Sequence, residues 1–122
     1  MSVTEFRRLK RGGNKYAANA VVEDQQRFDS KLERDRYLHL KQMRAIGVVD
    51  FFLRQVPFHL PGGIVYRLDF LVRWPPQHTA EPVTYEDCKG VLTRVSANKI
   101  KQVEHLYRIE VRIITREDMG RR

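Results

Sequence analysis

The chain has 122 residues, of which 42% are hydrophobic and 31% charged, and it carries a net charge of +8. This length holds one domain with a modest core, and the charge favours an anionic partner, nucleic acid ahead of a membrane surface. No run approaches the roughly 18 apolar residues of a transmembrane helix, and the basic N-terminus lacks the apolar segment of a signal peptide. The lone cysteine, Cys88, excludes an internal disulfide and indicates a reducing, cytoplasmic setting.

Residues 1–16 form the first segment that the sequence distinguishes. They contain five basic residues and one acidic residue, and the run Gly12-Gly13-Asn14 interrupts any regular structure. We expect a flexible basic arm that contacts nucleic acid, although a disordered solubilising tail explains the composition equally well. The candidate contacts in this arm are Arg7, Arg8, Lys10 and Arg11.

A helix is predicted from Ser30 to Ile46, ending at Gly47. Ser30 and Glu33 have the spacing of a capping box. Apolar residues follow at approximately helical intervals, at Leu32, Tyr37, Leu40, Met43 and Ile46. Glu33 has two interpretations, because it either caps the helix start or takes part in chemistry.

Three strands in a meander are predicted next, over Val48–Leu60, Ile64–Trp74 and Val83–Lys89. Pro61-Gly62-Gly63 predicts a tight turn between the first two, and the proline-rich segment 75–82 predicts a loop before the third. Pro57 indicates an edge strand or a break near the end of the first strand.

A second helix is predicted after the meander, with Ser96 as its cap and its end near Tyr107. Its apolar side consists of Ile100, Val103, Leu106 and Tyr107. The β-rich segment from Ile109 to Thr115 follows this helix, so we expect it to return to the sheet beside an earlier strand. Residues 117–122 are expected to be a polar tail.

Two of the predicted strands contain acids that could meet in the folded sheet, Asp69 and Asp87. Side chains alternate in a strand, so Tyr66, Leu68 and Phe70 are expected on one continuous apolar face and Asp69 on the reverse. In the third strand Asp87 and Lys89 share a face by the same rule. Placed side by side, the two strands would bring two carboxylates and one ammonium together. A divalent cation and a phosphodiester require such a group.

The order helix, three strands, helix, strand predicts an α/β domain over residues 17–116, with a central mixed sheet flanked by helices. This order resembles the PD-(D/E)XK nuclease superfamily, and more closely the small phage-encoded endonucleases described as Holliday junction resolvase-like. The resemblance covers about Phe28 to Ile114. It rests on three segments, Phe28-Asp29-Ser30-Lys31-Leu32-Glu33, Arg67-Leu68-Asp69-Phe70 and Glu86-Asp87-Cys88-Lys89-Gly90. Leu68 stands where the family's name has proline.

The resemblance implies an active site of Glu33, Asp69, Asp87 and Lys89. Asp69 and Asp87 would bind Mg²⁺, which Mn²⁺ could replace, together with the main-chain carbonyl of Cys88. Glu33 would reach the metal through water or hold a second ion. Lys89 would orient the attacking water or stabilise charge on the phosphate. The alternative for Lys89 is a structural salt bridge with the two acids.

The function implied is that of a Mg²⁺-dependent DNA endonuclease, selective for branched or otherwise structured DNA and acting in the cytoplasm of a bacterial host. A homodimer is expected by analogy, because a resolvase must cut two strands symmetrically. Arg94, Lys99 and Lys101 are candidate contacts to the DNA backbone. Two alternatives are a nucleic-acid-binding module without cleavage and an interaction protein that inhibits a host factor.

Other kinds of site have less support in the sequence. The histidines form no helical pair of the kind that binds zinc, since they stand at positions 39, 59, 78 and 105. Cys88 is expected on the face opposite Asp87 and Lys89, which suits a small buried hydrophobic residue better than a nucleophile.

Overall fold

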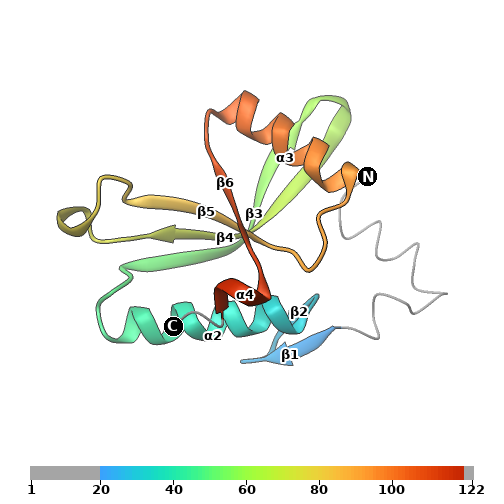
Figure 1. Cartoon of the computed structure of the whole chain (residues 1–122). Helices are drawn as coiled ribbons and strands as arrows, with labels where there is room; N and C mark the ends of the chain where they lie inside the picture. The colour runs from blue at the N-terminus through green and yellow to red at the C-terminus, as the bar shows by residue number, and fades with distance from the viewer. Residues whose placement is uncertain (1–19, 120–122) are drawn as a thin grey trace.

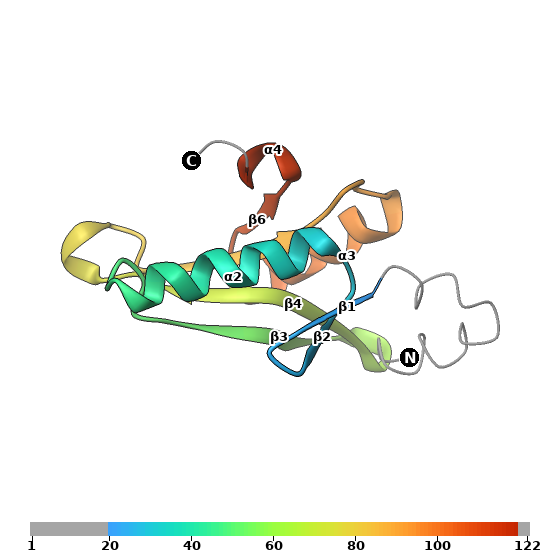
Figure 2. The same ribbon diagram turned by 90° about the horizontal axis from the view of Figure 1, so that it is seen from below.

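The computed structural model describes residues 20–119. A four-stranded mixed sheet with the strand order β3-β4-β5-β6 lies at its centre, and helices α2 and α3 cover opposite faces (Figure 1). A two-stranded sheet, β1 and β2, lies beside α2 (Figure 2). The predicted α/β fold is therefore confirmed. The predicted basic arm, with Arg7, Arg8, Lys10 and Arg11, lies outside the described residues.

Helix α2 (Lys31–Ala45) begins where the sequence predicts it. The hydroxyl of Ser30, the N-cap residue, accepts a hydrogen bond from the backbone N–H of Glu33 at 3.1 Å. The chain leaves the helix through Gly47, which has a φ of 83° and is the residue type that adopts this conformation most easily. Ile46 was expected on the apolar face, but it is 76% exposed because it already lies beyond the last turn.

Strands β1 (Val21–Glu23) and β2 (Gln26–Phe28) form a hairpin that the sequence analysis did not predict. Asp24 and Gln25 have φ values of 53° and 63° in its turn, as a tight two-residue hairpin turn requires. Phe28 is completely buried, and its ring lies 5.0 Å from the ring of Tyr37 on α2. The hairpin is therefore attached to α2 through an aromatic contact.

Strands β3 (Phe51–Leu60) and β4 (Ile64–Arg73) form the predicted hairpin around the turn 61–63. Strand β5 (Val83–Cys88) pairs antiparallel with β4 after the proline-rich loop. Strand β3 lies at the edge of the sheet, a position that tolerates Pro57, which has no N–H to donate.

Helix α3 (Arg94–Tyr107) connects β5 to β6 (Val111–Ile114), which runs parallel to β5 as predicted. The N-cap is Thr93 and not Ser96, because the hydroxyl of Thr93 accepts from the backbone N–H of Ser96 at 3.1 Å. Ile100 and Val103 are buried as expected. Two further residues predicted on this apolar side are instead 50% and 41% exposed, namely Leu106 and Tyr107.

The chain after β6 is more ordered than a polar tail. Helix α4 (Arg116–Met119) is a single turn whose Met119 is only 7% exposed. The guanidinium of Arg116 lies 2.6 Å from the carboxylate of Asp35 on α2. A buried methionine and an ion pair thus hold this turn against α2.

Strand β4 changes the helix that it faces at Asp69. Tyr66 and Leu68 pack in the hydrophobic cluster beneath α3, whereas Phe70 packs in the cluster beneath α2. The predicted alternation is observed, because Tyr66, Leu68, Phe70 and Val72 are all buried, but these apolar residues pack beneath two different helices. The change of face places Asp69 between the two hydrophobic clusters.

Candidate active site

Three side chains follow one another across the sheet at this change of face. Strands β3 and β4 keep one register on both sides of Gln55 and Asp69, which makes these two residues cross-strand neighbours. The ladder between β4 and β5 begins with the pair Phe70 and Glu86. Asp69 and Asp87 are therefore the next two residues in that register. Gln55, Asp69 and Asp87 thus come together from three adjacent strands.

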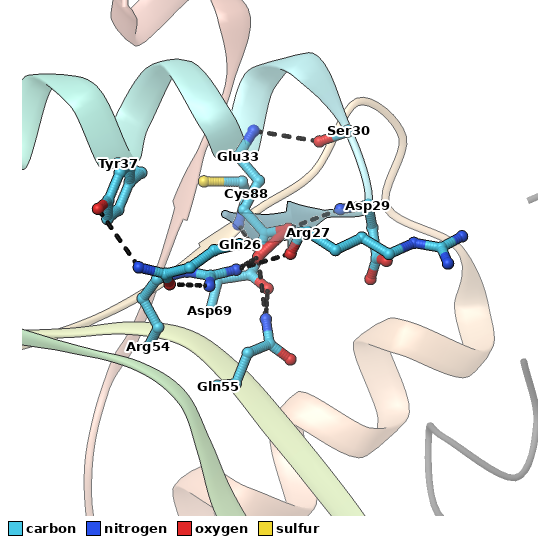
Figure 3. Close-up of polar contacts among 10 residues, drawn as sticks. All are labelled: Gln26, Arg27, Asp29, Ser30, Glu33, Tyr37, Arg54, Gln55, Asp69 and Cys88. Carbon is cyan, nitrogen blue, oxygen red and sulfur yellow. Dashed lines mark hydrogen bonds and ion pairs between the residues drawn. The ribbon is translucent and has the colours of Figure 1, made fainter. Parts of the chain in front are cut away.

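The carboxylate of Asp69 receives two hydrogen bonds. The backbone N–H of Cys88 donates to Oδ2 at 2.8 Å, and the amide of Gln55 donates to Oδ1 at 3.3 Å (Figure 3). In an extended strand the N–H and C=O of one residue point toward the same neighbouring strand. The carbonyl of Cys88, a predicted metal ligand, is therefore directed to the side of Asp69.

The electrostatic environment of Asp69 disfavours its charged form. Burial raises the pKa of Asp69 well above its usual range, and the neighbouring carboxyls of Asp87 and Glu33 raise it further. The hydrogen bond from Cys88 opposes this shift. Like charges and desolvation are the two standard causes of a raised carboxyl pKa. Asp69 is therefore a buried acid with two further carboxyl groups, those of Asp87 and Glu33, close to it.

Asp87 is 2% exposed and holds two partners on one oxygen. The hydroxyl of Tyr66 donates to its Oδ2 at 2.6 Å, and the ammonium of Lys89 lies 3.3 Å from the same atom. Burial and the charge of Asp87 raise the pKa of the Tyr66 phenol, which keeps it a hydrogen-bond donor. Asp87 and Lys89 therefore share a face, as predicted. They also form an ion pair, which is what the alternative interpretation of Lys89 as a structural salt bridge predicts.

Glu33 contacts both the start of α2 and Gln55, a residue that lines the pocket. Its Oε2 accepts from the backbone N–H of Asp29 at 3.2 Å, next to the N-cap of α2. Its Oε1 accepts from the amide of Gln55 at 2.9 Å, and the guanidinium of Arg54 lies 3.6 Å away. One carboxylate oxygen therefore serves the helix start while the other is linked to Asp69 through Gln55 (Figure 3).

The acids and the lysine border one pocket with a volume of about 190 Å³. Its walls combine negative and positive side chains from β4, β5 and α3. The lining residues are Asp29, Gln55, Val65, Tyr66, Arg67, Asp69, Asp87, Lys89, Ser96 and Lys99. Glu33 lies behind this wall and reaches it through Gln55. The predicted residues Asp69, Asp87 and Lys89 therefore share one cavity.

The predicted nucleic-acid contacts divide in the structure. Lys99 lines the pocket, whereas Arg94 and Lys101 are exposed on α3 and do not line it. Arg67 also lines the pocket, and its buried Nε has no hydrogen-bond partner among residues 20–119. The sequence contained a signal for Arg67, because it stands two residues before Asp69 on the same strand. We did not assign it a role.

Gln55 was also missed, and little in the sequence could have revealed it. It lies within a ten-residue strand, yet its φ is 54°. A non-glycine residue with positive φ is uncommon, and a periodicity analysis assigns this position to ordinary extended backbone. The side chain of Gln55 is directed at Glu33 and Asp69 (Figure 3).

The oxygen donors of the pocket fit a hard divalent cation. Mg²⁺ favours carboxylate and carbonyl oxygens and binds through one or two carboxylates plus water, which matches Asp69, Asp87 and the Cys88 carbonyl. Burial first and then the neighbouring carboxyls raise the pKa of Asp69, and such a cation would neutralise the charge of these carboxyls. Within residues 20–119, no three His, Cys, Asp or Glu side chains are already gathered as ligands of one ion. The proposed metal site uses two such side chains, Asp69 and Asp87, together with one main-chain carbonyl.

Cys88 packs against the hydrophobic cluster beneath α2. Burial raises the pKa of its thiol, and the nearby acids add to this effect. A thiol with a raised pKa is a poor nucleophile. The side chain therefore behaves as the small hydrophobic residue that the sequence predicts, while its backbone serves the site.

A second cavity, of about 490 Å³, lies apart from the acids. It is lined by Trp74, Pro75 and Thr84, with Ile46 and Val48 at its border. The indole N–H of Trp74 donates to the hydroxyl of Thr84 at 2.8 Å, so its polar group is already satisfied. None of the predicted catalytic residues lines this cavity.

Residues 13–117 match the model of a family described as a protein of unknown function, DUF1064. Because the match spans most of the chain, the protein belongs to this family. No curated protein matches the sequence. Over the described residues, no helix has the length and apolar character needed to cross a membrane.

Proposed function

We propose that this protein is a Mg²⁺-dependent endonuclease of the PD-(D/E)XK type that hydrolyses phosphodiester bonds in DNA. The observation that carries the proposal is the pocket shared by Asp69, Asp87 and Lys89. Two carboxylates and an ammonium converge there from neighbouring strands, and Glu33 is linked to them by one side chain. The resemblance of the sequence motifs to that superfamily supports the same proposal.

Different residues of the pocket would have different roles in hydrolysis. Asp69 and Asp87, with the Cys88 carbonyl, would hold Mg²⁺, and Glu33 would reach it through water. Bound there, Mg²⁺ neutralises phosphate charge and lowers the pKa of water. Lys89 contributes a positive charge that orients the attacking water or stabilises the negative charge growing on the phosphate.

The surrounding hydrogen bonds hold these groups in place before the substrate arrives. Tyr66 donates to Asp87 at 2.6 Å, and the N–H of Cys88 donates to Asp69 at 2.8 Å. The other oxygen of Asp69 accepts a hydrogen bond from the amide of Gln55 at 3.3 Å. A site whose groups are oriented in advance avoids reorganisation during the reaction.

The proposed substrate is DNA with branches or other structure, cut by a homodimer of the Holliday junction resolvase-like kind. The net charge of +8 supports an anionic polymer as the partner. Arg67 and Lys99 line the pocket beside the acids, where a phosphodiester would need positive neighbours. The proposed location is the cytoplasm of a bacterial host, an expectation that rests on the resemblance to phage-encoded enzymes.

The test uses the purified full chain with Mg²⁺, Mn²⁺ or EDTA on matched linear, flap and four-way DNA. We expect cleavage with either metal, none with EDTA, and a preference for a branched substrate. Lys89→Ala should lose cleavage and still bind Mn²⁺, whereas Lys101→Ala, an exposed lysine outside the pocket, should cleave normally. Absence of metal-dependent cleavage by the wild type on every substrate would refute the enzyme. Retained DNA binding would then favour the non-catalytic binding module.

A further inference from the structure

We propose that Gln55 is a positioning residue that fixes the relative placement of Glu33 and Asp69. The inference rests on the proposed nuclease function of this pocket. Its basis is a backbone distortion and a pair of hydrogen bonds that meet in one residue. Neither feature belongs to the sequence motifs that suggested the nuclease.

The backbone of Gln55 adopts a conformation that its strand does not require. Its φ is 54° in the middle of β3, while the residues on both sides pair with β4 in unbroken register. No residue is inserted here, so the distortion does not arise from a strand of unequal length. Left-handed conformations of residues other than glycine cost free energy and persist where the surrounding structure enforces them.

The side chain of Gln55 contacts both acids from this backbone conformation. Its Nε2 carries two hydrogens and donates to both acids, at 2.9 Å to Glu33 and 3.3 Å to Asp69. Glu33 lies on α2 and Asp69 on β4, so this amide is the contact that joins the helix acid to the strand acid. Figure 3 shows the amide nitrogen of Gln55 between the two carboxylates.

A neutral amide suits this position better than a cation does. An arginine or lysine between the acids would supply the same hydrogen bonds, but it would also neutralise the charge that a divalent cation needs. Arg54, the neighbouring cation, lies on the Glu33 side of this amide, where its guanidinium is 3.6 Å from the Glu33 carboxylate, lies 3.9 Å above the Phe28 ring and donates to Gln26 at 2.6 Å. Gln55 therefore orients two carboxylates and leaves their charge in place.

Gln55→Gly separates positioning from support of the fold. Glycine adopts positive φ without strain, so the variant should melt at the same temperature as the wild type or higher. We expect its metal-dependent kcat to fall about 100-fold, with the KM for DNA changed less than about twofold. The affinity for Mn²⁺, measured by calorimetry, should fall about tenfold.

The matched control is Gln25→Gly. Gln25 also has a positive φ, of 63°, but it is exposed in the turn between β1 and β2. The same substitution there should relieve the same strain and leave both rate and Mn²⁺ affinity unchanged. Gln55→Asn provides a second variant, because asparagine tolerates this backbone but is one methylene too short to reach both acids. It should also lose rate.

The outcomes separate this inference from the nuclease proposal. Wild-type rate and wild-type Mn²⁺ affinity in Gln55→Gly would overturn the positioning role even if the protein is a nuclease. If the wild type cleaves no DNA but binds Mn²⁺, a tenfold loss of that affinity in Gln55→Gly supports positioning while the nuclease fails. A wild type that neither cleaves DNA nor binds Mn²⁺ would overturn both.

Discussion

Glu86 and Asp87 are adjacent acids on β5, and they are 3% and 2% exposed. Glu86 faces α2, where Arg36 donates to both of its oxygens at 2.8 Å and 2.6 Å. Asp87 faces the pocket, where it meets a second carboxyl, Asp69, and one lysine. The two acids are equally buried and differ only in what surrounds them.

This difference shows that burial of an acid does not by itself indicate function. The Arg36–Glu86 pair is a complete unit, because a planar guanidinium matches a carboxylate in charge and geometry. Asp87 lacks such a bidentate partner, because Lys89 is a single ammonium at 3.3 Å and a second buried carboxyl, Asp69, lies in the same cavity. Two buried acids that share a cavity therefore indicate a candidate site better than burial alone does.

The strongest test of the comparison replaces each acid with its amide. Asp69→Asn and Asp87→Asn each remove a ligand charge without removing volume, so metal-dependent cleavage should fall about 1,000-fold or more. Glu86→Gln should keep the rate but lower the free energy of unfolding by about 3 kcal/mol, because it breaks a buried ion pair. Single-turnover cleavage and chemical denaturation measure the two effects. Near wild-type rates in either aspartate variant would refute the site.

Glu33 provides a second test of the comparison. One of its carboxylate oxygens accepts a hydrogen bond at the start of α2, and the other accepts one from Gln55. Glu33→Gln retains an acceptor for the helix start, so the melting temperature should change little. The loss of charge beside Asp69 should reduce the cleavage rate about 100-fold. Thermal denaturation and cleavage assays on the same preparation distinguish the two roles. An unchanged rate would show that Glu33 only caps α2.

The pocket cations provide the next test, with a smaller effect. Arg67→Ala should weaken DNA binding in EDTA and reduce the slope of log affinity against log salt by about 0.9, the loss of one phosphate contact on duplex DNA. Lys101→Ala removes an exposed charge from α3 and should change the slope less. Fluorescence anisotropy titrations over a salt series give both slopes. Equal slopes for the two variants would remove Arg67 from the binding surface.

The smallest expected effect is on the pH dependence of stability without metal. Because the folded-state pKa of Asp69 is raised, the folded protein keeps a proton that the unfolded chain releases above about pH 4. Stability from this group is therefore present at low pH and is lost as the pH rises toward the folded-state pKa. In EDTA, Asp69→Asn should flatten this decline between pH 4 and neutrality. A parallel decline in the variant would assign the effect to another group.

The sequence predicted those features of the candidate site that depend on local patterns. The capping spacing of Ser30 and Glu33 predicts the start of α2, and alternation in a strand predicts that Asp87 and Lys89 share a face. The position of Asp69 followed less directly, because the apolar alternation in β4 does not show which helix covers each part of the strand. The change of face depends on packing against two helices, which no periodicity within the strand encodes.

Gln55 and Arg67 show why the remainder of the site was not predicted. The role of Gln55 depends on a register with β4 and on a helix acid 22 residues earlier in the chain. Arg67 alternates onto the same face as Asp69 in the sequence, but its place in the pocket follows only from the fold. Thr93, in turn, caps α3 three residues before the residue that the spacing suggested. Each of these features arises from tertiary geometry.

The irregular backbone of β3 also affects how copies of this chain can associate. An edge strand exposes unpaired N–H and C=O groups, and a regular one offers a template for continuous pairing with another sheet. Here Gln55 leaves the extended conformation and Pro57, two residues later, has no N–H. A row of intermolecular hydrogen bonds along the whole of β3 is thereby interrupted. Two copies of this chain would therefore not join their sheets by continuous pairing along the whole of β3.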